Sequence, residues 1–179
     1  RGEFMFEVDL KFNDIEILSV EKKDIIPLKI FLDFQGDFLI NGEPIKLEYL
    51  YERFLEYYVS ECEFFSKIVK NDKIIGIIKG RLEIKNPNEV WIGSIFLDYN
   101  LRNQGIGTSI INNVLRHFFE EYGIEHFYTG VMEKSHIKIG FWKKNKFKIL
   151  RISKDFYNIE GKELNMIILK RNFSHSNII

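Results

Sequence analysis

The spacing of apolar side chains predicts a chain in which strands and helices alternate. In residues 46–60 and 105–122, apolar positions recur every three or four residues, which predicts two amphipathic helices. The same periodicity, over a shorter run, predicts a helix at 24–34, and a further short helix is expected at 134–144. Runs typical of strands cover residues 14–20, 63–70, 73–84, 89–97, 124–131, 148–153 and 163–170.

The order of these elements, β-α-α-β-β-β-α-β-α-β-β, predicts an α/β fold around a mixed, mostly antiparallel central sheet. We expect about six to seven strands flanked by four helices. Residues 36–44 are rich in Gly, Asp, Asn and Pro and predict a loop or a small hairpin. No repeat and no linker divides the sequence, so a single domain is expected.

The two ends of the chain are expected to lie outside the folded domain. Residues 1–4, which precede Met5, resemble a cloning remnant, and the domain is predicted to cover residues 5–171. The polar residues 172–179 are predicted to fray. There is no apolar run of about 18 residues and no signal peptide, so we expect a cytoplasmic protein that does not enter a membrane.

Composition excludes several classes of function. Lys and Arg together number 26, as do Asp and Glu, and the formal net charge of zero argues against a broad nucleic-acid footprint. The chain has a single cysteine, Cys62, which excludes an intramolecular disulfide and a cysteine-based zinc site. We therefore expect no metal and no nucleic-acid partner.

A binding signal lies where the strand at 89–97 leads into the helix at 105–122. Residues 96–108 read Phe-Leu-Asp-Tyr-Asn-Leu-Arg-Asn-Gln-Gly-Ile-Gly-Thr. The first amides of a helix have free N–H groups at the positive end of the helix dipole, so they attract phosphate. Gly105 and Gly107 let an anion approach the backbone, and Arg102 adds a positive charge.

Three interpretations of this turn compete. A Walker A loop needs Lys followed by Ser or Thr after the glycines, and neither pair is present. A dinucleotide fingerprint needs a third glycine where Ile110 stands, and it belongs after the first strand of a doubly wound sheet. A glycine-rich helix start without any ligand stays open for an isolated Gly-x-Gly.

The complete pattern, Arg102-x-x-Gly105-x-Gly107, resembles the Arg/Gln-x-x-Gly-x-Gly/Ala signature of the GNAT superfamily of acetyl-coenzyme A-dependent N-acetyltransferases. In that family the signature holds the pyrophosphate of coenzyme A, and the preceding strand bonds its pantetheine arm. The resemblance is strongest over residues 89–147, and it implies a sheet splayed between the strands at 89–97 and 124–131. The implied cofactor-binding residues are Ile95, Phe96, Leu97, Arg102, Asn103, Gln104, Gly105, Ile106, Gly107, Thr108 and Ser135.

A second stretch, Phe-Trp-Lys-Lys-Asn-Lys-Phe at 141–147, resembles the family element Phe-Tyr-x-Lys-x-Gly-Phe with two departures. Trp142 occupies the position of the tyrosine that protonates the departing thiolate, and an indole cannot serve as that acid at neutral pH. Lys146 replaces the glycine. Elsewhere, Ser135 replaces the usual Asn at a helix start, where it can cap the helix or meet the pantetheine.

The resemblance implies transfer of an acetyl group to an amine by direct attack in a ternary complex. Tyr128 is a second candidate for the acid, against a plain packing role in the sheet. Candidates for the base are Glu89, Asp98 and His126, whereas Glu133 and His136 are expected to face the solvent. The lysines between 134 and 146 form either a solvated surface or a contact with the 3′-phosphate of the cofactor.

The acceptor class and a second function remain open from the sequence. A small-molecule or peptide amine fits the resemblance equally, and a homodimer is not excluded. The alternative function, of a different class, is a coenzyme A-binding module with weak or no catalysis that serves regulation or assembly. Trp142 is the residue that keeps this alternative open.

Overall fold

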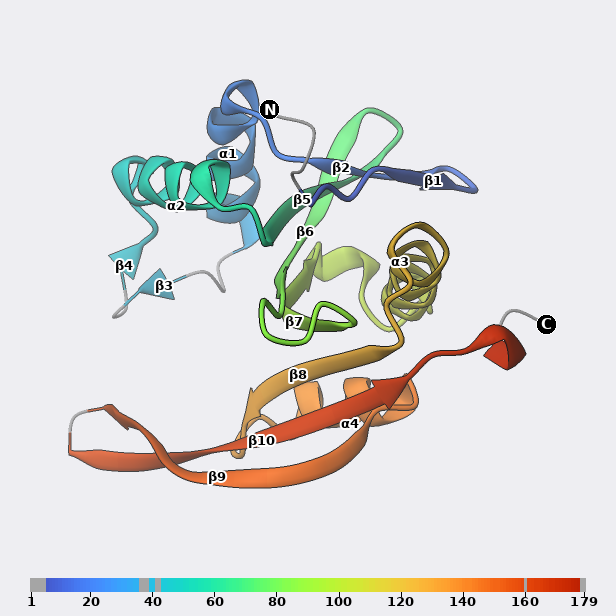
Figure 1. Ribbon diagram of the computed structural model, residues 1–179. Helices are drawn as coiled ribbons and strands as arrows, with labels where there is room; N and C mark the ends of the chain where they lie inside the picture. The colour runs from blue at the N-terminus through green and yellow to red at the C-terminus, as the bar shows by residue number, and fades with distance from the viewer. Residues whose placement is uncertain (1–5, 36–38, 41–42, 160, 178–179) are drawn as a thin grey trace. The chain divides into compact units, whose positions relative to one another are not determined.

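The computed structural model describes residues 6–35, 39–40, 43–159 and 161–177, and its chain forms two compact units (Figure 1). The first unit comprises residues 1–81 and 94–107, and the second comprises residues 82–93 and 108–179. Strand β7 (Glu89–Leu97) and helix α3 (Ile106–Tyr122) each run from one unit into the other. Residues 1–4, interpreted as a cloning remnant, lie outside the described residues.

The first unit is built on an antiparallel run of strands in the order β1-β2-β5-β6, next to which lies the last part of β7. A left-handed Asn13 (φ 51°) turns β1 into β2, and Asn71 and Asp72 (φ 49° and 58°) turn β5 into β6. Polar residues that tolerate positive φ suit such tight turns. The strands are β1 (Leu10–Phe12), β2 (Ile15–Ser19), β5 (Glu63–Lys70) and β6 (Lys73–Leu82).

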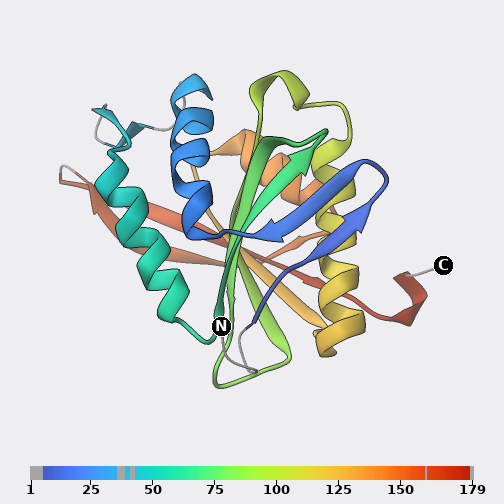
Figure 2. The same ribbon diagram turned by 90° about the horizontal axis from the view of Figure 1, so that it is seen from above.

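Two helices, α1 (Ile25–Gln35) and α2 (Leu47–Val59), lie side by side in this unit (Figure 2). Their apolar faces form one core with side chains of the strands, since burying such a face is what stabilises a helix in a protein. The core contains Val20, Ile25, Leu28, Phe31, Leu32, Ile45, Leu50, Phe54, Tyr57 and Ile77. Between the helices, β3 (Leu39–Ile40) and β4 (Glu43–Pro44) pair as the small hairpin predicted there.

The second unit contains the start of β7 followed by the strands β8, β10 and β9 in that order. Strand β8 (His126–Met132) runs parallel to β7, and β10 (Lys162–Asn172) runs antiparallel to both β8 and β9 (Lys148–Ile159). Among the described residues, β7 and β8 pair over three positions, from Glu89–His126 to Trp91–Tyr128. The two strands thus pair at their N-terminal ends, as expected of splayed strands.

Helix α3 supplies the core of the second unit. Its apolar stripe is fully buried at Ile110, Ile111, Val114, Leu115 and Phe118. The ring of Phe118 stacks on that of Phe127 in β8, with centroids 6.2 Å apart. The sequence shows the same periodic stripe, so the observed helix and its buried face agree with the prediction.

A buried cation joins three elements of the second unit. Arg171, 5% exposed, lies at the end of β10, and its Nη1 donates to Asn112 Oδ1 of α3 at 2.9 Å. The same nitrogen donates to the carbonyl of Asn145, after α4 (His136–Lys144), at 3.0 Å. Burial lowers the pKa of Arg171 from its ordinary value. A buried polar group needs such partners, and the sequence alone does not reveal them.

Three predictions about the fold need correction. Within the described residues the main sheet has eight strands, one more than the highest number predicted, because the three-residue strand Leu10–Phe12 is too short to show a period. Strand β9 continues to Ile159, past the predicted end at residue 153. The tail does not simply fray at residue 172: Phe173 is 3% exposed, and its amide donates to the carbonyl of Glu125 at 2.8 Å. No helix in the described ranges is long and apolar enough to cross a membrane.

Candidate cofactor and acceptor sites

The predicted phosphate-binding turn belongs to the first unit and follows β7 directly. Asp98 caps a short 3₁₀ helix, Tyr99–Leu101, by accepting the Asn100 amide on its carboxylate at 2.8 Å. The Tyr99 amide donates to the side chain of Gln35 at the end of α1, also at 2.8 Å. The turn is therefore fixed to the unit before the glycines begin.

Arg102 is held against the end of β7. Its Nε donates to the carbonyl of Leu97 at 2.9 Å, and its guanidinium lies over the ring of Phe96, 4.8 Å from the centroid. A guanidinium over an aromatic face gains a cation–π interaction. Arg102 thus connects the end of β7 to the glycine turn.

The backbone after Arg102 has the shape that the glycine signature requires. Asn103 and Gly105 are left-handed, with φ of 61° and 83°, and α3 begins at the next residue, Ile106. Residues 103–105 are exposed, and Gly107 occupies the second position of the helix. The side chain of Gln104 donates to the carbonyl of Asn100 at 2.7 Å and so folds back on the turn. The first-turn amides of a helix that follows an exposed, left-handed glycine form an anion-binding geometry.

Gly76, which the sequence did not single out, supports this turn from β6. A Cβ built on Gly76 would collide with the carbonyl oxygen of Phe96 and would lie 3.4 Å from the Cα of Leu97. The adjacent carbonyl of Ile75 accepts the Asp98 amide at 2.7 Å. Only a residue without a side chain lets β6 lie this close to the end of β7.

The second unit carries a row of polar and aromatic side chains across β7, β8 and β10. The hydroxyl of Tyr128 donates to Glu89 Oε1 at 3.2 Å. The ring of Tyr128 stacks on that of Trp91, with centroids 5.1 Å apart, while Lys170 Nζ lies 5.1 Å from its centroid on the β10 side. Phe127 faces α3, so its neighbour Tyr128 points to the opposite face of the sheet.

Glu89 and His126 are register partners in the next row of the same face. The Nδ1 of His126 lies 3.0 Å from Asn172 Oδ1. The structure therefore brings together two of the predicted base candidates, Glu89 and His126, with the acid candidate Tyr128. Asp98, the third base candidate, belongs to the other unit and holds the 3₁₀ helix.

Helix α4 places the residues at which the sequence departs from the family pattern. Trp142 is 4% exposed, and its ring packs edge-on against Phe147 with centroids 4.8 Å apart. Ser135 is the N-cap residue, but its side chain makes no capping hydrogen bond. Lys146 has φ 66°, the left-handed conformation that a glycine adopts freely. That Trp142 stands at the family's acid position remains a prediction.

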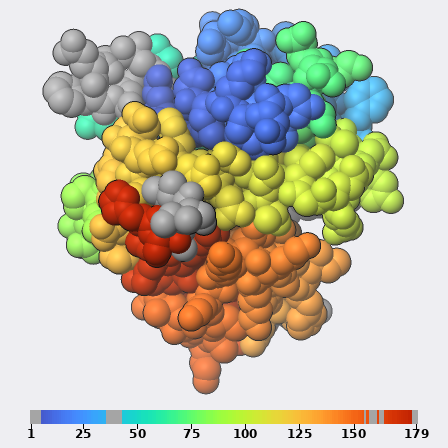
Figure 3. Space-filling model, turned by 90° about the vertical axis from the view of Figure 1, so that its right-hand side faces the viewer, coloured from blue at the N-terminus to red at the C-terminus, as the bar shows by residue number. Residues whose placement is uncertain are grey.

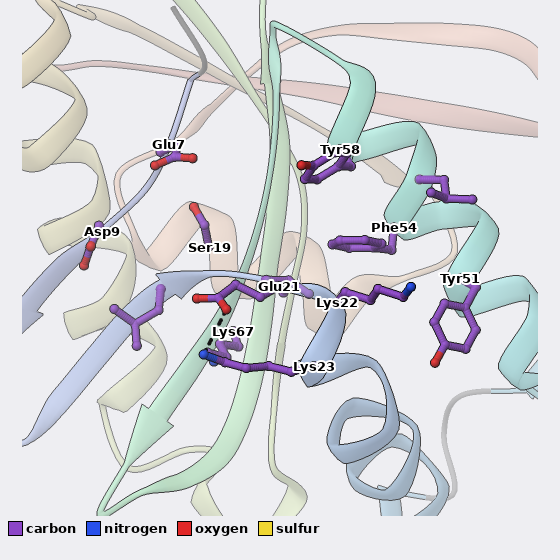
Figure 4. A pocket seen from close by; sticks show the side chains of 13 residues that line it. Glu7, Asp9, Ser19, Glu21, Lys22, Lys23, Tyr51, Phe54, Tyr58 and Lys67 are labelled. Atoms are coloured by element: carbon purple, nitrogen blue, oxygen red, sulfur yellow. Dashed lines mark ion pairs between the residues drawn. The ribbon is translucent and has the colours of Figure 1, made fainter. Parts of the chain in front are cut away.

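A cavity of 1020 Å³ in the first unit was not predicted (Figure 4). Carboxylates of Glu7, Asp9 and Glu21 line it together with the aromatic rings of Tyr51 and Tyr58. The cavity lies beside the 3₁₀ helix Lys22–Asp24, which precedes α1, whereas Gln35 at the other end of α1 contacts the glycine turn. No local motif marks such a cavity, because its lining comes from distant segments.

Comparison with solved structures shows the fold. A Salmonella typhimurium acetyl transferase that modifies the N-terminal serine of 50S ribosomal subunit protein L7/L12 has a TM-score of 0.77 at 13% identity, covering 91% of this chain and 97% of that chain. A variant of the spermidine N-acetyltransferase of Vibrio cholerae has a TM-score of 0.71 at 12% identity, covering 89% of this chain and 94% of that chain. The microcin C7 self-immunity acetyltransferase, in complex with acetyl-CoA and AMP, has a TM-score of 0.73 at 14% identity, covering 90% of this chain and 94% of that chain.

A family model matches the sequence, although no single curated protein does. The family model described as the acetyltransferase (GNAT) domain matches residues 17–168, which include the glycine turn, the Glu89–Tyr128 pair and α4. Since this match covers far more than half of the chain, the protein belongs to the GNAT family of acetyltransferases.

Proposed function

We propose that this protein transfers the acetyl group of acetyl-coenzyme A to an amine. The observation that carries the proposal is the glycine turn: Gly105 is left-handed, α3 begins at Ile106, and Arg102, three residues before Gly105, is held against the end of β7. The residues fit a pyrophosphate, because phosphate oxygens accept hydrogen bonds from the amides of a helix start and from a guanidinium. Solved relatives in fold include one in complex with acetyl-CoA, and others named for acetylating spermidine or a protein N-terminus.

Residues 102–108 are proposed to bind the pyrophosphate, and residues 95–97 the pantetheine arm. Acetyl-coenzyme A supplies a thioester whose carbonyl accepts a nucleophile. In a direct attack within a ternary complex the amine is that nucleophile, and no residue of the chain becomes acylated. The developing negative oxygen needs N–H donors, and backbone amides of β7 are proposed for that role.

Glu89 is proposed to receive the proton of the acceptor amine. An amine is largely protonated at pH 7 and must lose a proton before it attacks. The Glu89 carboxylate is half-buried and accepts the hydroxyl of Tyr128, so its orientation is fixed. The ring of Trp91, which stacks on Tyr128 and is partly exposed, adds an aromatic surface beside it, which suits a cationic group. Tyr128 then acts as a positioning residue for Glu89.

The departing thiolate needs a proton, and the residue at the family's acid position is Trp142. A positioned acid contributes roughly 10²–10⁴-fold to rate. Because a thiolate is a tolerable leaving group, its absence slows the reaction without preventing it. Tyr128 directs its hydroxyl proton at Glu89, so water is the proposed proton source. A slow transferase is therefore expected.

An amine panel tests the proposal. Purified protein is incubated with acetyl-coenzyme A and with polyamines, amino acids, aminoglycosides or peptides with free N-termini, and the release of free thiol is followed. The expected result is amine-dependent thiol release that Gly107→Trp abolishes. If the wild-type protein binds coenzyme A in calorimetry but acetylates no amine, the catalytic proposal fails and the binding module is the better description. Failure to bind coenzyme A at all would overturn both.

A further inference from the structure

Positive charge is concentrated in one segment of an otherwise acidic chain. Residues 134–154 contain eight Lys or Arg and no Asp or Glu, although the whole chain has a formal net charge of zero. The remaining residues therefore carry a formal net charge of −8. The eight cations are Lys134, Lys138, Lys143, Lys144, Lys146, Lys148, Arg151 and Lys154.

This segment folds as α4 and the first half of β9, and all eight cationic side chains are exposed. Figure 3 shows the segment, in orange, as one continuous surface. Aliphatic side chains are interspersed among the cations: Ile137 is 90% exposed, Leu150 is 54% and Ile152 is 50%. We call the exposed residues of 134–154 the basic surface.

Local structure accounts for part of this charge. Lys143 and Lys144 lie in the last turn of α4, where the negative end of the helix dipole favours cations. Lysines on an edge strand such as β9 discourage pairing with another sheet. A cofactor phosphate would engage one or two of the lysines. None of these effects explains why the segment lacks a single acidic residue, or why its aliphatic side chains are exposed.

We propose that the basic surface docks an acidic polypeptide segment that also carries aliphatic side chains. Glutamate or aspartate would pair with the cations, and the aliphatic groups would cover Ile137, Leu150 and Ile152. Strand β9 ends the sheet, with β10 as its one strand neighbour among the described residues, so its outer edge offers backbone groups to an extended chain. The partner is thus a protein, and it need not be the acetyl acceptor.

Two other occupants fit less well. A second copy pairing through β9 would bring Lys148, Arg151 and Lys154 of each chain together, and like charges destabilise such a contact. A nucleic-acid backbone has no apolar groups to cover the aliphatic side chains, and seven of the eight cations are Lys, not the bidentate Arg.

The experiment uses a dye-labelled 14-residue peptide of alternating glutamate and leucine, with fluorescence anisotropy as readout. The full-length protein is expected to bind it in low salt and to release it progressively as NaCl increases. The triple variant Lys148→Glu/Arg151→Glu/Lys154→Glu should bind at least about tenfold more weakly. The matched control, Lys73→Glu/Arg81→Glu/Lys85→Glu, alters the same residue types at exposed positions and the net charge equally, and should bind like wild type.

Four results would overturn the proposal. They are equal weakening in both triple variants, equal binding of a lysine–leucine peptide, tighter binding of single-stranded RNA or of phosphatidylserine vesicles than of the acidic peptide, and full competition by coenzyme A. The last would assign the lysines to the cofactor. Retained peptide binding in the presence of saturating coenzyme A supports a separate docking surface, whatever the acetylation assay shows.

Discussion

The glycine turn of the first unit and the Glu89–Tyr128 face of the second unit are built in opposite ways. The turn is one continuous segment, Asp98–Gly107, in which the backbone itself presents donors, and Gly105 is required by its φ of 83°. The face is assembled from side chains of β7, β8 and β10, which are about 40 residues apart in sequence at each step. The first site depends on the conformation of the backbone, and the second depends on the register between strands.

This contrast determines how each site fails. A backbone site tolerates changes of exposed side chains but fails when bulk enters the space of the ligand. A side-chain site survives changes in bulk at its border but loses its chemistry when one functional group is replaced. Binding of coenzyme A and turnover should therefore respond to separate sets of substitutions.

The largest effect is expected at the turn. Gly107→Trp places an indole where the pyrophosphate would bind, and the loss of two charge-assisted hydrogen bonds should weaken coenzyme A binding about 10²–10⁴-fold. Calorimetry measures the affinity, and circular dichroism reports whether the fold is retained. Gly107→Ala is the matched control and should bind nearly normally, because the family signature accepts alanine there. Equal affinity of all three proteins would place the cofactor elsewhere.

The next effect concerns the side-chain site. Glu89→Gln keeps the shape and the hydrogen bond from Tyr128 but removes the proton acceptor, so kcat should fall about 10²–10³-fold. The dissociation constant of coenzyme A should not change. Tyr128→Phe removes only the fixing hydrogen bond and should lower kcat about tenfold or less. If Glu89→Gln instead weakens coenzyme A binding and spares kcat, cofactor binding and catalysis are not separated between the two sites as proposed.

The sequence predicted the turn much better than the face, and the reason is physical. Arg102, Gly105 and Gly107 act at a fixed spacing in one segment, so local sequence contains the whole constraint. The contact between Glu89 and Tyr128 depends on which residues of two distant strands stand side by side, and no local pattern encodes that register. The same limit explains why Gly76 and the buried Arg171 were not recognised: each is defined by partners far away in the chain.

Gly76→Ala tests how far the turn depends on its support. The new methyl group would collide with the carbonyl of Phe96, and backbone cannot move aside as a flexible side chain can. We expect a loss of about 1–3 kcal/mol in the free energy of unfolding, measured with urea. Coenzyme A affinity should also fall in the folded protein, because Phe96 and Leu97 would shift. Gly140→Ala, with open space around its Cβ, should do neither.

A smaller gain is expected from Trp142→Tyr. A phenol can donate the proton that an indole cannot, so turnover should rise severalfold, well short of the roughly 10²-fold that a fully positioned acid supplies. Because Trp142 is buried against Phe147, the smaller ring should also cost about 1–2 kcal/mol in stability. Trp142→Phe is the control, with a similar loss of packing and no acid. Equal turnover of the two variants would make the position a packing element only.

The smallest expected effect is a change in stability that leaves the function of both sites unaltered. Lys146 closes α4 in the left-handed region, where its amide donates to the Lys143 carbonyl and the next amide, of Phe147, donates to the Trp142 carbonyl, both at 3.0 Å. A non-glycine residue in this conformation is strained by about 1–2 kcal/mol, and glycine relieves that strain but increases the entropy of the unfolded chain. Lys146→Gly should therefore stabilise the protein by about 0.5–1 kcal/mol in urea unfolding, with turnover unchanged.

Lys146→Ala, which keeps the strained φ and removes the same charge, should not stabilise it. A gain in both variants would mean that charge repulsion within the basic surface, not backbone conformation, limits stability at the end of α4.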